Sequence, residues 1–324
     1  MPYLLKLLCL CLASFFLVHL ALSIAIWLAT PAAIRIAARI RPVLGARLLL
    51  FLRMLPAGLG GFTVAALCVP SYLWLEPKTV SGEGIGLVCL ALSVLTLTLG
   101  GFSITRAGLA LARSLRYLRH CQRTGLKTEL AGESLPAWIV DQPGALFVIA
   151  GVFRPRLLVS RQVTQVLSGE QLSAAVRHER AHWTSHDNLK RLMLALAPGM
   201  LPFFYGFARL ERGWAIYTER AADDQAVGGD ARRSLSLAAA LVGVSRLGAV
   251  PKAPVLAVPL LADDDLPGRV ERLLNTPPRT EANASWMGCL VAAAAVMLSG
   301  AVIALGLQPE VLHPIHRVLE HLIG

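Results

Sequence analysis

The spacing of apolar residues along the chain predicts four long helices. Runs of about 20 or more mostly apolar residues cover residues 4–28, 55–75, 84–104 and 286–307. About 20 helical residues cross the hydrocarbon core of a bilayer, so each run is expected to be a transmembrane helix. The first run is too long for a signal peptide and has no small-residue cleavage site before Pro31, and we therefore expect it to be retained.

A fifth apolar run, residues 192–208, has a different character. It contains Pro198, Gly199 and Pro202, and proline removes a backbone donor from a helix interior. A crossing here would also place the polar motifs on its two sides across the membrane from each other. We expect a re-entrant or interfacial helical hairpin, with a buried helix pair of a soluble domain as the alternative.

The region between the third and fourth runs is long enough for a domain with its own core. Residues 145–153 and 157–160 are apolar and favour β-structure, and Arg154-Pro155-Arg156 between them indicates a short hairpin. A free strand edge there would suit an extended substrate backbone, although a hairpin that only covers the core is an equal alternative. Ser168 and Gln171 form a capping box that opens a helix to about residue 187, and a further helix is expected over 214–227.

These elements predict a mainly α membrane protein with a small β-hairpin in its domain. The expected parts are a three-helix transmembrane region at 1–115, a domain at 116–285, a fourth span at 286–307 and a short outer tail at 308–324. Arginines without acidic neighbours follow the first and third spans, and the positive-inside rule then places residues 31–54 and 106–285 in the cytoplasm.

Composition agrees with a membrane location. The chain is 55% apolar and 16% charged, with a mean hydropathy of +0.60 and a formal net charge of +11. In so apolar a chain the positive charge indicates membrane topology and anionic lipid as partner, and no nucleic-acid motif accompanies it. The six cysteines show no metal-ligand spacing and indicate no disulfide framework.

The strongest chemical motif is His178-Glu179-Arg-Ala-His182. Two histidines four residues apart share one face of a helix and can bind one zinc ion. Glu179 is placed to act as the general base that activates a water molecule for attack on a peptide carbonyl. We therefore expect one zinc ion per chain.

Catalytic zinc usually has three protein ligands, and Glu219 is the best candidate for the third. Asp223 lies four residues later on the same helical face, where it can accept a hydrogen bond from a ligand imidazole. His186 is expected to play a supporting or surface role, because three successive helical turns do not direct three side chains at one tetrahedral ion. Tyr205 and Tyr217 are weaker candidates for stabilising an oxyanion.

These motifs together resemble the BlaR/MecR-type membrane zinc metallopeptidases. The resemblance rests on Phe153-Arg-Pro-Arg156 with Leu157-Leu-Val-Ser160, on the two motifs around His178 and Glu219, on Asp187-Asn-Leu189, and on Gly268-Arg-Val-Glu-Arg-Leu-Leu274. It covers residues 135–280 in detail and the rest in layout. Only about 17 residues follow the fourth span, so the resemblance does not extend to a C-terminal penicillin-binding sensor domain.

The resemblance implies a gluzincin-type α+β protease domain that faces the cytoplasm of a bacterial inner membrane. It assigns His178, His182 and Glu219 as zinc ligands, Glu179 as general base and Asp223 as the orienting residue. It also implies site-specific cleavage of a cytoplasmic or juxtamembrane protein, typically a transcriptional repressor, which makes the protein an antirepressor. Two alternatives stay open: an HtpX-like quality-control protease, and a non-catalytic receptor that retains the protease fold.

Overall fold

The computed structural model describes most of the chain up to residue 275. The described residues are 3–75, 85–130, 136–142, 144–201, 206–248, 258–259 and 265–275. The expected fourth span at 286–307, the tail at 308–324 and Tyr205 lie outside them.

Three long helical segments are apolar and long enough to cross a membrane. They are α1 (Tyr3–Arg39), the continuous segment Pro42–Leu75, and α4 (Leu87–Thr124). The middle segment consists of α2 (Pro42–Thr63), a π-helical turn η1 (Val64–Cys68) and α3 (Val69–Leu75). The first two expected spans lie within the first two segments, and the third coincides with α4 from Leu87 onward, so the chain is consistent with a membrane protein.

The expected loop at residues 31–54 is wrong, because these residues are almost entirely helical. α1 continues through Pro31 to Arg39, and α2 begins three residues later at Pro42. Ala37 and Leu49 are fully buried where the two helices meet. A Cβ atom at Gly45 would lie 3.1 Å from the Ala37 carbonyl oxygen, so glycine permits this close approach. Packing between the two helices thus compensates for the backbone hydrogen bond lost at Pro31.

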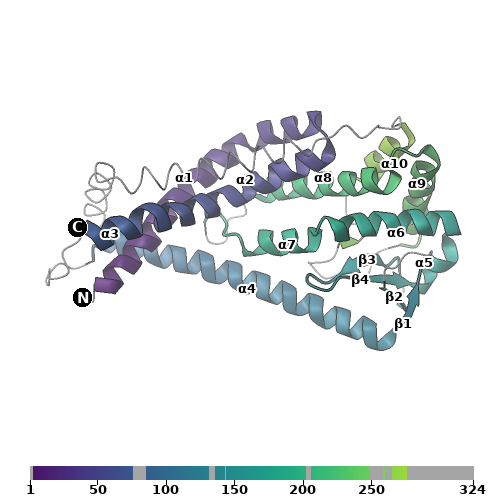
Figure 1. Cartoon of the computed structure of the whole chain (residues 1–324), viewed down its shortest axis with the longest axis horizontal. Coiled ribbons are helices and arrows are strands. Elements are labelled where there is room, and N and C mark those ends of the chain that lie inside the picture. The colour runs from purple at the N-terminus through teal and green to yellow at the C-terminus, as the bar shows by residue number, and fades with distance from the viewer. Residues whose placement is uncertain are drawn as a thin grey trace.

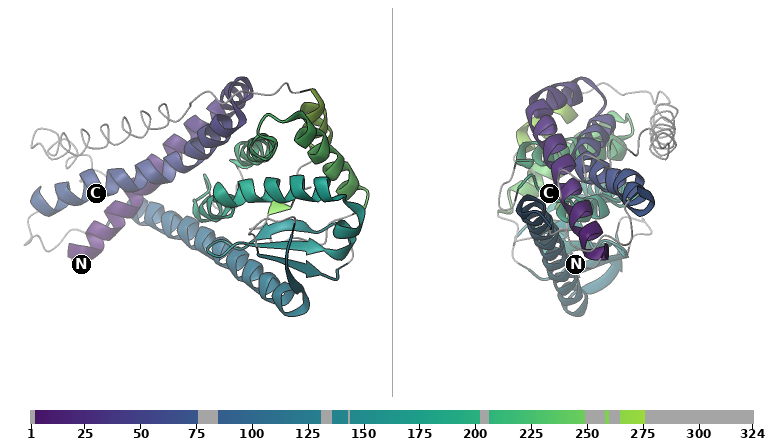
Figure 2. Two further views of the ribbon diagram at one scale, coloured as in Figure 1. Left: turned by 45° about the vertical axis from the view of Figure 1, so that its right-hand side comes forward. Right: turned by 90° about the vertical axis from the view of Figure 1, so that its left-hand side faces the viewer.

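The basic stretch after the third span is also helical, since α4 extends to Thr124. Its arginines at 113, 116, 119 and 123 are exposed on this one helix. α4 then contributes a layer to the following domain, and the boundary expected after residue 115 falls inside the helix. Figures 1 and 2 show α4 diverging from α1 and α2, with the remaining elements between these two arms.

The domain contains a five-stranded sheet, larger than the single hairpin expected. Strands β3 (Phe147–Ala150) and β4 (Arg156–Ser160) form that hairpin, and β4 also pairs in parallel with β2 (Pro136–Val140). The edges are β1 (Leu126–Glu129), antiparallel to β2, and the two-residue strand β5 (Val258–Pro259), antiparallel to β3.

Alternate residues of the sheet face two different helical layers. On one face Phe147, Ile149 and Val159 pack into a core with α6 and α9. On the other face Val148 and Leu158 pack against Leu118 of α4. A strand directs successive side chains to opposite faces, so this sheet is buried on both sides and is anchored directly to the third long helix.

Four further helices carry or surround the polar motifs. They are α6 (Gly169–Thr184), α7 (Asp187–Leu196), α8 (Ala208–Val227) and α10 (Leu266–Asn275), while α5 (Arg161–Val166) and α9 (Ala231–Ser245) complete the domain. The capping box at the start of α6 is confirmed: Ser168 Oγ accepts from the Gln171 N–H, and Gln171 Oε1 accepts from the Ser168 N–H at 2.9 Å. α6 ends at Thr184, three residues before the expected end, and His186 in the turn has a positive φ of 55°.

The turn between α7 and α8 is held by one side chain from each long helix. Arg106 of α4 donates to the carbonyl oxygens of Leu194 and Ala195, at 3.1 and 2.9 Å through Nη2. Arg53 of α2 donates to the Ala197 carbonyl at 3.1 Å and to Glu211 at 2.7 Å.

His19 of α1 completes this group, with Nε2 2.7 Å from the Gly199 carbonyl oxygen. The last carbonyls of a helix have no partner within it. We call His19, Arg53 and Arg106 the polar clasp, because they supply the partners that the end of α7 and its turn require. The described part of the expected hairpin up to residue 201 therefore contacts all three long helices.

Replacing Arg106 by methionine should destabilise the protein, because it leaves the last carbonyls of α7 without their donor. We expect a loss on the order of 1–3 kcal/mol, seen as a lower midpoint of thermal unfolding in detergent. The matched control is Arg113→Met, which changes an exposed arginine two turns along the same helix and should shift stability by no more than about 0.5 kcal/mol. Equal midpoints for the two variants would contradict the role of the clasp.

Candidate metal centre

His178 and His182 meet on one face of α6, deep inside the protein. Both side chains are buried, with exposed fractions of 0% and 1%. Their Nε2 atoms lie 3.1 Å apart, and the two rings are nearly perpendicular. The helical spacing of four residues thus produces the convergence that the sequence predicted.

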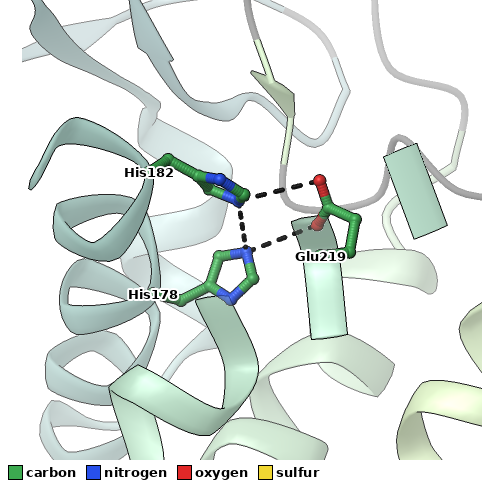
Figure 3. Close-up of side chains that lie close together, drawn as sticks. All are labelled: His178, His182 and Glu219. Atoms are coloured by element: carbon green, nitrogen blue, oxygen red, sulfur yellow. Dashed lines mark hydrogen bonds and ion pairs between the residues drawn. The ribbon is translucent and has the colours of Figure 1, made fainter. Parts of the chain in front are cut away.

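Glu219 approaches the same point from α8. One carboxylate oxygen lies 3.5 Å from His178 Nε2 and the other 3.6 Å from His182 Nε2. Figure 3 shows the three side chains converging. Tetrahedral zinc with bonds of 2.0–2.1 Å separates its ligand atoms by about 3.3 Å, close to these distances. The buried group His178, His182 and Glu219 could therefore hold a metal ion.

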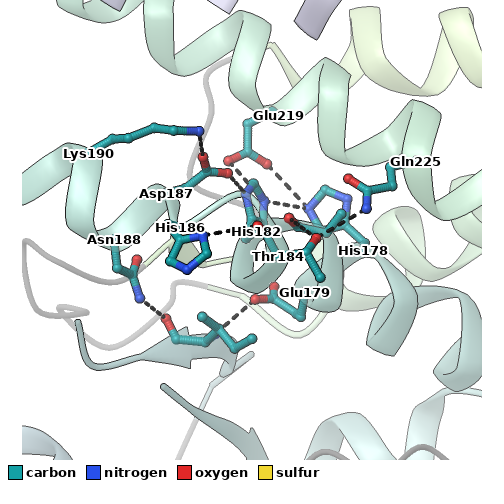
Figure 4. Close-up of polar contacts among 12 residues, drawn as sticks. His178, Glu179, His182, Thr184, His186, Asp187, Asn188, Lys190, Glu219 and Gln225 are labelled. Atoms are coloured by element: carbon teal, nitrogen blue, oxygen red, sulfur yellow. Dashed lines mark hydrogen bonds and ion pairs between the residues drawn. The ribbon is translucent and has the colours of Figure 1, made fainter. Parts of the chain in front are cut away.

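A carboxylate orients each imidazole from the side opposite the convergence point. Asp223 Oδ1 lies 2.9 Å from His178 Nδ1, and Asp187 Oδ2 lies 2.8 Å from His182 Nδ1. An Nδ1–H that donates to a carboxylate leaves Nε2 with its lone pair free for a metal. The sequence predicted this role for Asp223 and missed it for Asp187. Asp187 begins α7 and contacts Lys190, at 2.8 Å (Figure 4).

Arg269 of α10 holds the carboxylates of α8. Its guanidinium donates to both oxygens of Asp223 at 2.9 and 2.8 Å, and its Nη1 lies 3.1 Å from Glu219. The side chain is only 1% exposed. Sequence reasoning did not single out Arg269, although it lies in the segment Gly268–Leu274 that carried part of the family resemblance. A buried arginine with a bidentate carboxylate contact fixes geometry as well as charge.

The electrostatics of the group favour a cation. Four buried carboxylates surround the imidazoles, those of Glu179, Asp187, Glu219 and Asp223. The cationic side chains that contact them are Arg269 and Lys190. Among the described residues, four ionised carboxylates, two cations and two neutral imidazoles would leave a surplus of two negative charges, which matches a divalent ion.

The pKa shifts reflect the same surplus. Burial alone would lower the pKa of His182, but Glu219 and Asp187 outweigh it and raise the pKa to about 10. Burial would likewise lower the pKa of His178, but Asp223 and Glu219 outweigh this effect and raise it. Against the effect of burial, Arg269 with His178 lowers the pKa of Asp223 to about 2, and His182 with Arg269 holds that of Glu219 well below its usual range. The imidazoles thus attract protons in a pocket where a metal ion would supply positive charge instead.

Glu179 lies beside the group and is held by the sheet. Its Oε2 accepts a hydrogen bond of 2.8 Å from the Ile149 N–H of β3, while its buried Oε1 has no hydrogen-bond partner among the described residues. Burial raises the pKa of Glu179 to about 7, against the opposing effect of the two imidazoles. Asn188 of α7 fixes the same strand by donating to the Ile149 and Gly151 carbonyls (Figure 4). The hydrogen bond to Ile149 therefore fixes Oε2 of Glu179, and Oε1 is left able to accept a proton or a hydrogen bond.

The remaining candidates lie outside this group. His186 is exposed, and its ring contacts the Thr184 carbonyl. Tyr217 packs in a hydrophobic cluster with residues of α1 and α2. The edge of β3 expected to be free is paired with β5 at Val148 and Ile149. The structure thus brings together His178, Glu179, His182, Glu219 and Asp223, and adds Asp187 and Arg269.

Fold and site together define the class: the described part of the chain is mostly helical, has three helices able to span a membrane, and contains a buried His-His-Glu group able to hold a metal ion. Comparison of the sequence with protein-family models and with curated proteins found no match. Function must therefore be argued from the site itself.

Replacing Asp223 by asparagine should weaken metal binding without removing a ligand. The change removes the charge that orients His178, and such partners typically contribute 10–100-fold in affinity. Titration of the metal-free protein with Zn²⁺ would measure the Kd. Asp224→Asn is the matched control, because Asp224 is the next residue of α8 and pairs with Arg272, away from the imidazoles. Similar affinities for both variants would contradict the orienting role.

Proposed function

We propose that this chain is a zinc-dependent membrane endopeptidase. The observation that carries the proposal is the position of Glu179 beside the His178, His182 and Glu219 group, with one oxygen anchored and the other unpaired. A structural metal site has no use for such a carboxylate, whereas hydrolysis requires a base next to the metal.

Zinc is the metal that this donor set suits best. Two imidazole nitrogens and one carboxylate oxygen are a common catalytic zinc set that leaves a fourth position open. The ligand-atom separations of 3.1–3.6 Å and the surplus of two negative charges support a divalent, tetrahedrally bound ion. When bound, zinc would polarise a peptide carbonyl. It would also lower the pKa of water, so that the water could be deprotonated and attack near neutral pH.

The side chains around the group would then divide the work. Glu179 accepts the proton of the attacking water at Oε1, and its raised pKa suits a base that must also release the proton to the leaving amine. Asp187 and Asp223 hold the imidazoles in the tautomer that presents Nε2. Arg269 keeps Glu219 and Asp223 ionised and in place.

The substrate class and location follow from the resemblance to BlaR/MecR-type metallopeptidases. That resemblance supports a bacterial inner-membrane protein whose site faces the cytoplasm and cleaves a cytoplasmic or juxtamembrane protein such as a repressor. The three long helices support a membrane location. A quality-control protease of the HtpX type would use the same residues and would differ by cleaving many proteins.

Glu179→Gln should abolish peptide hydrolysis while zinc stays bound, because it removes the base and retains the three ligands. We expect kcat to fall by about 10²–10⁴-fold, measured by mass spectrometry of a peptide library incubated with purified protein. Glu170→Gln is the matched control, since Glu170 is an exposed residue in the first turn of the same helix. Wild-type protein that binds zinc and cleaves nothing would refute the proposal and favour the non-catalytic receptor.

A further inference from the structure

Helix α7 carries an apolar strip that the described residues leave partly exposed. Leu189, Met193 and Leu196 follow one another at helical spacing and are 36%, 45% and 45% exposed. On its other sides, α7 buries Leu192 against α4 and Leu194 against the cluster formed by α1, α2 and α8. α7 is therefore wedged between the long helices with one apolar face open.

This strip lies beside the apolar surface of α4. Leu192 of α7 packs against Ala107 and Ala110 of α4. Around that contact α4 exposes Ile104 and Leu109, at 66% and 48%. The open face of α7 therefore adjoins a surface that a membrane-spanning helix presents to lipid.

The polar clasp ties the end of α7 to the boundary of the expected spans: His19 lies inside the first apolar run, and Arg53 and Arg106 lie two residues outside the second and third. His19, whose ring contacts the Gly199 carbonyl, lies nine residues before Leu28, the end of the first apolar run. Nine helical residues span about 14 Å. Backbone carbonyls at such depth cannot bond to water and must find partners within the protein. Arg53, Arg106 and His19 meet that requirement. Together they contact four carbonyl groups at the end of α7 and in the turn, those of Leu194, Ala195, Ala197 and Gly199.

We propose that the strip Leu189, Met193 and Leu196 is a lipid-contact surface, seated in the acyl chains beside α4. Hydrocarbon is the occupant that its apolar character and its continuity with α4 indicate. If the strip faced water, it would enlarge the apolar surface exposed by α4. The turn beside it bonds its carbonyl groups to protein side chains, as a segment in hydrocarbon must.

The position of this strip in the bilayer limits the class of protein that the site could cut, an inference that rests on the proposed function. α7 is ten residues long, from Asp187, which contacts the proposed ligand His182, to Leu196. Ten helical residues cover about 15 Å, a distance that an extended peptide covers in about five residues. The substrate would then be a membrane-anchored protein, cut within a few residues of the point where its chain leaves the bilayer.

Photolabelling of the wild-type chain tests the lipid contact directly. The protein is reconstituted in phosphatidylcholine vesicles with an apolar diazirine, and carbene adducts are mapped by mass spectrometry. Leu97 and Ile104 of α4 are the internal positive controls, and Leu126, which begins β1 just beyond the far end of α4 and is 65% exposed, is the aqueous control. We expect the strip to be labelled about tenfold more than Leu126, because the probe partitions into hydrocarbon.

A strip labelled no more than Leu126, while Leu97 and Ile104 are labelled, would overturn the proposal. So would a strip that is shielded from the probe and instead cross-links to a second copy of the chain. Bimane attached at Met193→Cys and at Leu126→Cys, in a background without other cysteines, gives a second measurement: brominated lipid should quench the former alone. Because neither readout needs catalysis, a labelled strip in a protein that hydrolyses nothing would retain the lipid surface and refute only the proposed function.

Discussion

The structure depends on the convergence of two imidazoles and four carboxylates, all of them buried in the protein interior. Burying charges costs several kcal/mol per ion unless they are paired and hydrogen-bonded. Here Asp187 and Asp223 pair with the imidazoles, Arg269 pairs with Glu219 and Asp223, and Glu179 is bonded to β3. These partners come from α6, α7, α8, α10 and the sheet, so the site and the packing of the domain specify each other.

α4 links this domain to the segments that can span a membrane. Its first half is one of the three long apolar helices, and its second half covers one face of the sheet through Leu118 and Cys121. Between these halves Arg106 donates to the Ala195 carbonyl at the end of α7, eight residues after Asp187, which contacts His182. A rigid helix thus connects the long segments, the sheet that anchors Glu179 and the helix that orients a ligand. A movement of α4 would therefore affect the site through two elements, the sheet that anchors Glu179 and helix α7, which begins with Asp187.

Features that depend on residues close together in the sequence could be predicted, and contacts between residues far apart in the sequence could not. The helix around His178 has a local signature, a capping box followed by histidines at helical spacing, and it was predicted correctly. Glu219 and Asp223 were found because a two-histidine site requires a further ligand. Arg269 was missed because its partners lie 46 and 50 residues earlier in the chain, and no local pattern marks that contact.

Two structural errors have the same kind of origin. Residues 31–54 looked like a loop because they carry arginines and prolines, yet the contact of Gly45 with Ala37 makes a close helical hairpin favourable. β1 and β2 were missed because they are only four and five residues long and gain stability from pairing with each other and with β4. Tertiary packing overrode local propensity in both places.

The central claim is that His178, His182 and Glu219 bind one metal ion. X-ray absorption spectroscopy at the zinc edge, on protein purified without chelators and loaded with one equivalent of zinc, tests it most directly. We predict a shell of nitrogen and oxygen atoms at about 2.0–2.1 Å, with multiple scattering from two imidazoles that falls to that of one imidazole in His182→Ala. A zinc ion that is released on desalting, or a spectrum without imidazole scattering, would contradict it.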